Sequence, residues 1–326
     1  MDPNKDIPPK PSFLKEMKLM HDHSNHSGHS HKKKKNPSKL FFLRLAHSNS
    51  YVALPILAIT IATYMTVGSY QFDWNYLAFI FFSTLFLYPL HRLIGLRLTL
   101  PIEYSPSQKS VSKNPNIARG SVIIGLLGSL IFTFQLSQEI FQLLIPLGIV
   151  AITYSLPLIP TGNGWKRLRD IPGLKIYAIS TVVTVTTSSI PLLLSNEFLL
   201  NDILLLGVQR FLFILAVTIP FDVRDVRIDK KWSLKTIPII LGSDQALLLS
   251  KVLLFIAPLI TFYQFFTSDT IHLAICLAVV VSHLWAVYMI EKFKKYNAPL
   301  FNAYMLEGTM VFQFAIITIT QILISF

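Results

Sequence analysis

The sequence has few charged residues and almost no cysteine. Only 14% of its 326 residues are Asp, Glu, Lys or Arg, against about 25% in an average soluble protein. Hydrophobic residues make up 52%, so the scarcity of charge excludes an ordinary soluble domain and indicates a polytopic membrane protein. The one cysteine, Cys276, lies inside an apolar run, which excludes a disulfide framework and a cysteine-based metal site.

Acidic residues are scarcer than basic ones, at 17 against 29, which gives a net charge of +12. In a soluble protein this excess would suggest a nucleic-acid partner. In a membrane protein it follows from the positive-inside rule, which concentrates Lys and Arg in cytoplasmic loops. We therefore expect membrane lipid, and no nucleic acid, as a partner of this chain.

The first 45 residues or so lack the apolar run of a signal peptide. Being polar and proline-rich, residues 1–45 predict a disordered cytoplasmic tail. The tail contains clustered histidines and then a lysine run: His21, His23, His26, His29 and His31, then Lys32 to Lys35. Such histidines can bind Zn²⁺, Ni²⁺ or Cu²⁺ adventitiously, but nothing nearby would fix a ligand geometry, so we expect no folded metal site.

Apolar runs dominate residues 46–326, and each is close to the roughly 20 residues that cross a bilayer. They occupy 51–69, 77–96, 121–137, 140–158, 174–195, 203–221, 244–266, 271–290 and 306–326. The sequence therefore predicts an all-α fold, a bundle of about nine transmembrane helices. It shows no inverted repeat of the kind typical of transporters.

Lys and Arg fall on alternate connections between these runs. Nearly all of them lie in one set of segments: the tail and the loops near 97–120, 159–173, 222–243 and 291–305. The other set contains acids but no Lys or Arg: 70–76, 138–139, 196–202, 267–270 and the C-terminus. By the positive-inside rule, we expect an integral protein of a bacterial inner (cytoplasmic) membrane, with a cytoplasmic N-terminus and the C-terminus outside.

The stretch from Pro220 to Lys231 ends the sixth apolar run and carries three carboxylates. On a helix, Asp222, Asp225 and Asp229 fall within an arc of about 60°. Three cations fall on the opposite face: Arg224, Arg227 and Lys231. Clustered carboxylates repel one another unless a cation lies between them, and their oxygens suit Mg²⁺ shared with substrate phosphates. The alternative is a solvated helix end whose Asp and Arg side chains simply pair.

Basic residues crowd the loops on the same predicted side as these carboxylates. Ammonium and guanidinium groups bind phosphate oxygens well. We therefore expect five of them to contact the phosphates of an anionic ligand: Lys166, Arg167, Arg169, Lys175 and Lys235. Alternatively, they only orient the protein and contact lipid headgroups.

The aspartate stretch, followed by Lys235-Thr236 and Gly242, resembles the second aspartate-rich motif of the UbiA superfamily of intramembrane prenyltransferases. Tyr154-Ser155-Leu-Pro157 followed by Lys166-Arg167 resembles that family's segment between its fourth and fifth helices. Nine helices with the N-terminus inside is also its architecture. The resemblance covers residues 45 to 326 approximately.

This resemblance implies a Mg²⁺-dependent transfer of an isoprenoid chain from a prenyl diphosphate to a lipophilic, aromatic acceptor. It implies that Asp222, Asp225 and Asp229 hold the metal and that the basic loop residues hold the diphosphate. The isoprenoid tail is then expected among aromatic side chains of the second apolar run: Phe81, Phe82 and Phe86.

The family's first aspartate-rich motif, however, is missing from the end of the second apolar run. Residues 87–96 contain no carboxylate, and their polar side chains include His91 and Arg92. Arg92 either binds diphosphate directly or extends to lipid headgroups, and His91 could donate a hydrogen bond or act as a base. The first reading supports an active, unusual enzyme. The second supports a non-catalytic UbiA-fold protein that binds an isoprenoid or lipid or scaffolds a partner.

Arg210 is a further departure, because it lies within the sixth apolar run and no acid in a neighbouring run is an obvious partner. Hydroxyl groups of the Ser- and Thr-rich fifth run could accept its hydrogen bonds.

The one-sided distribution of Lys and Arg makes the topology testable. A reporter fused after Phe326 should lie outside the cytoplasm, and a reporter inserted at Asn297 should lie inside it. Reporter accessibility in whole cells distinguishes the two positions. Finding both reporters on the same side would contradict nine spans.

Overall fold

The structure, a computed structural model, describes residues 50–98, 104–161, 164–195, 199–231, 234–268, 270–295 and 299–326. Within these ranges the chain is almost entirely helical, which confirms the predicted all-α fold. The predicted tail lies outside the described residues, so its boundary and its histidines stay predictions. The strands that the structure describes form one short antiparallel hairpin, β1 (Ile159–Thr161) and β2 (Gly164–Lys166).

Nine helical segments of the described ranges correspond to the nine predicted spans. They are α3 (Ala53–Thr66), α4 (Trp74–Leu98), α6 (Pro115–Thr133), α7 (Gln138–Ser155), α8 with η4 and α9 (Leu174–Thr184, Val185–Ser189 and Ile190–Ser195), α10 (Leu200–Lys231), α12 (Ser243–Thr267), α13 (Leu273–Lys295) and α14 (Pro299–Ser325). Eight of these segments are long and apolar enough to cross a membrane, judged by length and composition. The exception is α3, which has 14 residues and follows the 3₁₀ turn η1 (Ser50–Val52).

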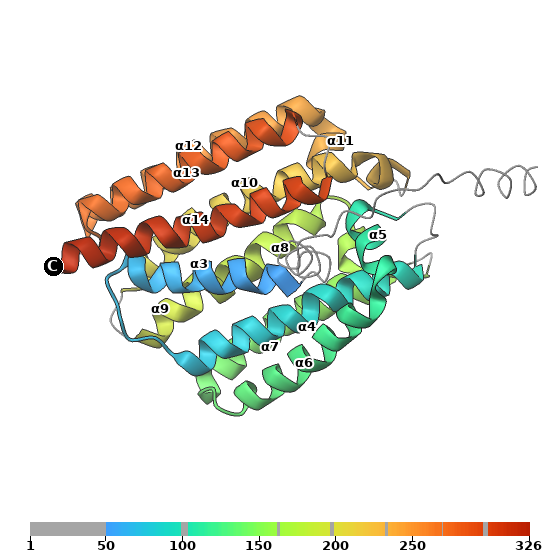
Figure 1. Cartoon of the computed structure of the whole chain (residues 1–326), viewed down its shortest axis with the longest axis horizontal. Coiled ribbons are helices and arrows are strands. Elements are labelled where there is room, and N and C mark those ends of the chain that lie inside the picture. Colours follow the sequence, from blue (N-terminus) through green and yellow to red (C-terminus); the bar gives the residue numbers. More distant parts are fainter. Residues whose placement is uncertain are drawn as a thin grey trace, which may run out of the picture. The chain divides into compact units, whose positions relative to one another are not determined.

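Short elements lie on the connections that are rich in Lys and Arg: α5 (Pro106–Lys113), η3 (Leu168–Asp170) and α11 (Ile237–Leu241). In Figure 1, α5 and α11 lie at the same end of the helix bundle. We call this the charged end, because Lys175 and Asp222 line a cleft together with residues of α11, and Asp229 contacts the same Lys175. The C-terminus of the chain lies at the opposite end (Figure 1).

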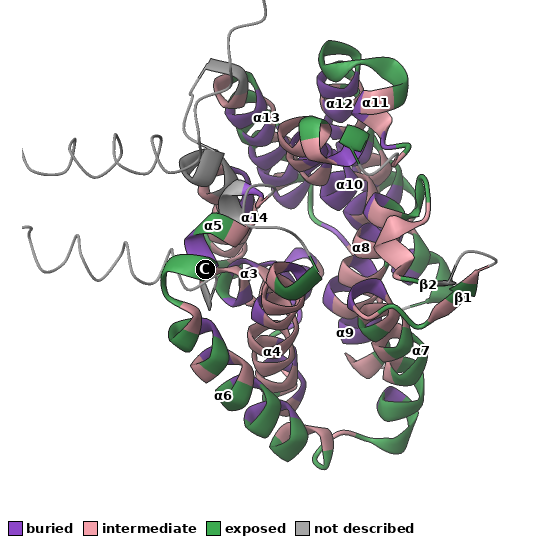
Figure 2. Ribbon diagram, turned by 90° about the vertical axis from the view of Figure 1, so that its right-hand side faces the viewer, coloured by how far each residue is buried: buried purple, intermediate pink, exposed green. Residues whose placement is uncertain are grey.

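Helix α10 is the central element of the bundle. It packs against α8, α11, α12, α13 and α14. In its most apolar stretch of 18 residues, 67% of the residues are buried, while the corresponding value for α6 is 28%. Figure 2 shows this contrast between the buried α10 and the exposed α6. Its 32 residues span about 48 Å at 1.5 Å per residue, which exceeds a hydrocarbon core of about 30 Å. The helix is therefore long enough to carry its aspartates beyond the apolar layer.

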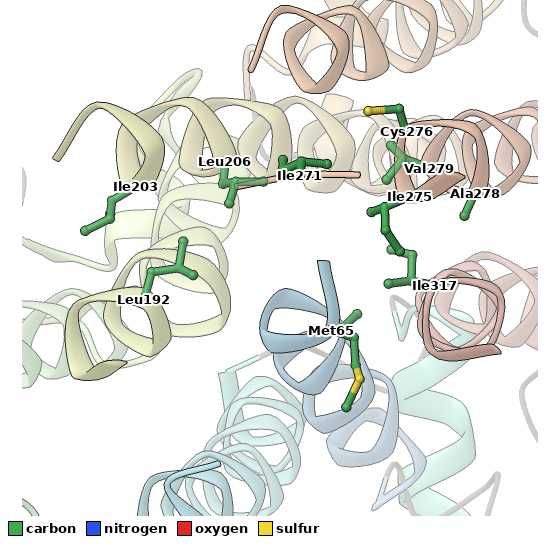
Figure 3. Packing of buried hydrophobic residues seen from close by; sticks show 11 residues of the cluster. Met65, Leu192, Ile203, Leu206, Ile271, Ile275, Cys276, Ala278, Val279 and Ile317 are labelled. Carbon is green, nitrogen blue, oxygen red and sulfur yellow. The ribbon is translucent and has the colours of Figure 1, made fainter. Parts of the chain in front are cut away.

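Aliphatic side chains fill the bundle near the end opposite the charged end. Met65 of α3, Leu192 of α9, Leu206 of α10 and Ile317 of α14 belong to one buried cluster, shown in Figure 3. Cys276 is fully buried in the same cluster, as its apolar sequence context predicts. This packing fixes the far ends of five helices and so determines how α3, α10 and α14 approach one another at the charged end.

Helices α4 and α6 pack closely because α6 presents glycines to α4. A Cβ on Gly125 would collide with the backbone at Phe86, and a Cβ on Gly128 would collide with the ring of Phe82. The Phe82 ring also stacks on Phe132 of α6, with the two ring centroids 5.7 Å apart. Phe82 therefore belongs to helix packing and not to the expected chamber for an isoprenoid tail.

Arg210 is buried in α10 and bonded to α3. Its guanidinium donates hydrogen bonds to the carbonyl oxygen of Ile59 (2.9 Å) and to Thr63 Oγ1 (3.0 Å). Thr63 donates in turn to the carbonyl oxygen of Thr187 at 2.7 Å. Thr187 lies in the π-helical turn η4, where the changed pattern of backbone hydrogen bonds leaves carbonyl groups available to side chains. The fifth span thus contributes a backbone carbonyl, and the expected hydroxyl comes from Thr63 of the first span.

We expect the Thr63→Val substitution to destabilise the bundle by about 1–3 kcal/mol. It keeps the side-chain shape but removes an acceptor from a buried guanidinium and a donor from the Thr187 carbonyl. Thr267→Val is the matched control, because Thr267 is exposed and bonds mainly within its own helix. Unfolding midpoints in detergent compare the two, and equal effects would contradict the role given to Arg210.

Candidate functional site

Two of the three predicted carboxylates share one cation at the charged end. Asp222 and Asp229 lie two turns apart on the same face of α10 and are only 2% and 4% exposed. The Nζ of Lys175, from α8, lies 2.7 Å from Asp222 Oδ1 and 3.4 Å from Asp229 Oδ2. This arrangement confirms that these two aspartates share a face, and it shows that an ammonium group lies between them.

The third carboxylate, Asp225, is held by its neighbour in the sequence. Arg224 donates two hydrogen bonds to it, from Nε to Oδ1 at 2.8 Å and from an Nη to Oδ2 at 2.9 Å. The prediction that Arg224 points to the opposite face is therefore wrong, because its long side chain turns back toward Asp225. The prediction is correct for Arg227 and Lys231, which are exposed.

The turn that leads into α8 positions Lys175. Gly173 has a φ of +80°, a conformation that side chains other than hydrogen disfavour, and α8 begins directly after it. Before this turn, Asp170 of η3 accepts two hydrogen bonds from the Arg167 side chain, at 2.7 and 2.8 Å. Arg167, predicted to hold phosphate, thus already has a carboxylate partner.

A small cleft of about 90 Å³ opens beside Lys175 and Asp222. Arg169, Lys235 and Thr236 also line it. The cleft offers three cations and two buried atoms without a hydrogen-bond partner among the described residues, Asp222 Oδ2 and Thr236 Oγ1. Three of the five predicted phosphate-binding cations therefore meet at one place.

The end of α4 contributes a second group of charges. Arg92 donates a hydrogen bond to Tyr88 Oη at 2.8 Å, and its guanidinium lies 5.0 Å from the centroid of the Tyr88 ring. Tyr88 Oη donates to Glu307 Oε1 of α14 at 3.4 Å. Arg92 and Arg224 both lie near enough to Glu307 for their charges to act on it. Arg92 is therefore part of a network within the protein.

His91 contacts the Tyr154-Ser155 segment, which lies between the fourth and fifth spans. Its ring centroid lies 5.4 Å from that of Tyr154, and its Nε2 lies 3.5 Å from Ser155 Oγ. The other ring nitrogen of His91, Nδ1, is buried and has no hydrogen-bond partner among the described residues. Arg169 covers the Tyr154 ring at 5.6 Å from the centroid, which connects this group to the cleft.

Two features of the site differ from the sequence prediction. Lys166 is exposed on β2 and is not a lining residue of the cleft. Tyr88 and Glu307 were not predicted as site residues. Glu307 is an acid near the start of the last span and Tyr88 lies one turn before Arg92, so an inspection of every polar residue inside the spans could have identified both.

The three aspartates do not form the predicted Mg²⁺ site as they are arranged. In the part of the chain that the structure describes, no three His, Cys, Asp or Glu side chains are grouped to hold a metal ion. The physical reason is that cations of the chain already occupy the carboxylates: Lys175 lies between Asp222 and Asp229, and Arg224 holds Asp225. Carboxylate oxygens are suitable ligands for Mg²⁺, but those of the three aspartates are held by these cations and do not meet at one point.

The fold is similar to those of several solved structures. One is an apo UbiA homologue from Aeropyrum pernix K1, with a TM-score of 0.58, 14% identity, and coverage of 85% of this chain and 99% of that chain. A structure of digeranylgeranylglyceryl phosphate synthase has a TM-score of 0.52, 12% identity, and coverage of 87% and 97%. A UbiA homologue from Archaeoglobus fulgidus bound to GPP and Mg²⁺ has a TM-score of 0.50, 17% identity, and coverage of 85% and 98%.

Comparison of sequences alone gives no match, either to a protein-family model or to a curated protein. The similarity to the solved structures extends over nearly their whole length, while fewer than one residue in five is identical. The architecture of the helices, and not the sequence as a whole, carries the relationship. This chain is an all-α, polytopic membrane protein with the fold of the UbiA homologues.

Proposed function

We propose that the chain binds a prenyl diphosphate at the charged end and transfers its isoprenoid chain to a lipophilic, aromatic acceptor in the membrane. The observation that carries the proposal is the cleft where Arg169, Lys175 and Lys235 meet beside the buried aspartates. Support comes from the fold, since a UbiA homologue of this architecture binds GPP. The bacterial inner membrane and the orientation of the termini remain predictions from the loop charges.

The cations of the cleft would act on the leaving group. When the bond between the allylic carbon and the diphosphate oxygen breaks, both electrons leave with the diphosphate and its negative charge grows. Lys175, Arg169 and Lys235 line the cleft where they can stabilise that charge. Lys175 is largely buried, with 12% of its side chain exposed, so its interaction with the charge is stronger than in water. The acceptor then forms a bond to the carbocation and loses a proton. His91, whose Nδ1 has no partner among the residues that the structure describes, is the candidate base.

Mg²⁺ dependence is what the family resemblance implies. The Archaeoglobus homologue binds Mg²⁺ together with GPP, and Mg²⁺ in general supplies charge neutralisation to a departing diphosphate. In this chain the ion would first have to displace Lys175 and Arg224 from the aspartates. The roles given above therefore rest on the chain's own side chains.

A second candidate function is non-catalytic: a UbiA-fold protein that binds an isoprenoid or lipid, or scaffolds a partner. The observation in its favour is that α4 ends without any carboxylate, while the aspartates of α10 are already paired with cations. The two candidates differ in product formation and not in ligand binding.

We expect Arg169→Gln and Lys235→Gln each to weaken the binding of geranyl diphosphate by about tenfold or more, since a hydrogen bond to a charged group contributes about 1.5–3 kcal/mol. Arg119→Gln is the matched control, because Arg119 lies in α6 and its side chain bonds Asn116. Equilibrium binding of the labelled diphosphate to purified protein measures the effect. Unchanged binding in both cleft variants would contradict the site.

Incubation of the purified protein with labelled geranyl diphosphate and a membrane-lipid extract tests transfer itself. The proposed enzyme should yield a labelled lipophilic product and release diphosphate. Binding without any product, with and without added Mg²⁺, would favour the non-catalytic candidate.

A further inference from the structure

We propose that Lys175 is the resident cation between Asp222 and Asp229 and takes the place of a divalent metal ion at this site. The chain then binds diphosphate with its own ammonium and guanidinium groups, independently of Mg²⁺. The identity of the ligand rests on the proposed function. The replacement of the metal rests on the geometry of Lys175 and its partners.

The position of Lys175 Nζ leaves no space for a metal ion between the two carboxylates. Mg²⁺ would have to lie about 2.0–2.1 Å from the oxygens of Asp222 and Asp229. The ammonium nitrogen already lies 2.7 Å from one of these oxygens and 3.4 Å from the other. Only 12% of the Lys175 side chain is exposed, against 3% and 5% for the two aspartates. Lys175 therefore cannot move aside into water without leaving both carboxylates buried and uncompensated.

The remaining ligand of a metal centre is engaged in the same way. Asp225 uses both oxygens to accept from Arg224, in the two-point geometry that guanidinium and carboxylate groups favour. Arg224 is itself largely buried, with 8% of its side chain exposed. A metal bound to Asp225 would have to break this pair and place a divalent charge beside the guanidinium.

The end of α4 contributes a cation, whereas a metal centre shared between α4 and α10 would need carboxylates on both helices. Residues 87–96 at the end of α4 contain no carboxylate. Arg92 is held there by Tyr88, and its charge acts on Asp225 as well as on Glu307. Carboxylates and cations therefore lie together across α4, α8, α10 and α14, and each of the four carboxylates has a cation of the chain near it.

The same groups explain how such a site could still hold a diphosphate. Lys175 lines the cleft together with Arg169 and Lys235, so its ammonium can contact both the aspartates and an anion in the cleft. Asp222 Oδ2 and Thr236 Oγ1, which have no hydrogen-bond partner in the described part of the chain, can accept from a bound water or from a protonated phosphate oxygen. Three cations therefore contribute to the wall of the cleft, and Asp222 and Asp229 fix the position of one of them, Lys175.

The test uses the full chain in detergent and two probes, Mn²⁺ alone and inorganic diphosphate alone. Electron paramagnetic resonance of free Mn²⁺ should show no tight site in the natural protein. Lys175→Met removes the ammonium at similar side-chain length, and it should create a Mn²⁺ site at least about tenfold tighter, because two buried carboxylates then lack a cation. Lys235→Met is the matched control: it should gain no Mn²⁺ binding but should weaken diphosphate binding.

Diphosphate binding to the natural protein provides a readout that needs no variant. Its affinity should be the same in Mg²⁺ and in EDTA. A tight Mn²⁺ site in the natural protein that Asp222→Asn abolishes, or diphosphate binding that requires Mg²⁺, would overturn the inference and leave the proposed function intact. No diphosphate binding under either condition would refute the proposed function, while the gain of Mn²⁺ binding in Lys175→Met would still support the role of Lys175.

Discussion

The buried carboxylates at the end of α10 require positive charge beside them, and Lys175 provides it. Asp222 and Asp229 are nearly inaccessible to water, where an unpaired negative charge is costly. Removing one partner from a buried ion pair typically destabilises a protein by about 3–5 kcal/mol. The contact between α8 and α10 at this end therefore combines one ammonium group with the apolar packing of Ile176 against Leu215 and Ile219. Lys175 also lies at the wall of the cleft, so stability and the proposed ligand binding would depend on the same side chain.

The rest of the bundle holds this contact in place. At the middle of α10, Arg210 ties the helix to α3 and, through Thr63, to the π-helical turn of the fifth span. Because η4 follows α8 directly, the same network fixes α8, the helix that carries Lys175 near its start. Apolar packing around Met65 and Leu206 fixes the far end. A change in any of these contacts would alter the distance between Lys175 and the aspartates.

The fold was largely predictable because two independent features of the sequence indicate it: the length of the apolar runs and the distribution of charge over the loops. Runs of about 20 apolar residues and the alternation of Lys- and Arg-rich loops gave the same nine segments. The site was less predictable, because a helical wheel gives the direction of a Cβ and not the reach of a side chain. Arg224 illustrates this: its backbone faces away from Asp225, but its guanidinium returns to it. Contacts between distant spans, such as Tyr88 with Glu307, leave no pattern in a single sequence.

A site that is built from the chain's own cations differs chemically from one that recruits a metal ion. Fixed ammonium and guanidinium groups need no free metal and cannot be removed by a chelator. They carry one charge each, so several are needed to stabilise a diphosphate. The meeting of Arg169, Lys175 and Lys235 at one cleft satisfies that requirement. It also offers a physical reason why the site needs no carboxylate at the end of α4.

The most direct measurement is an experimental structure of the protein soaked in Mn²⁺ together with diphosphate, with the manganese located by its anomalous scattering. The account predicts no manganese peak between Asp222 and Asp229, with Lys175 Nζ within salt-bridge distance of both and diphosphate density against Arg169 and Lys235. A manganese peak coordinated by these aspartates, with Lys175 displaced, would contradict it.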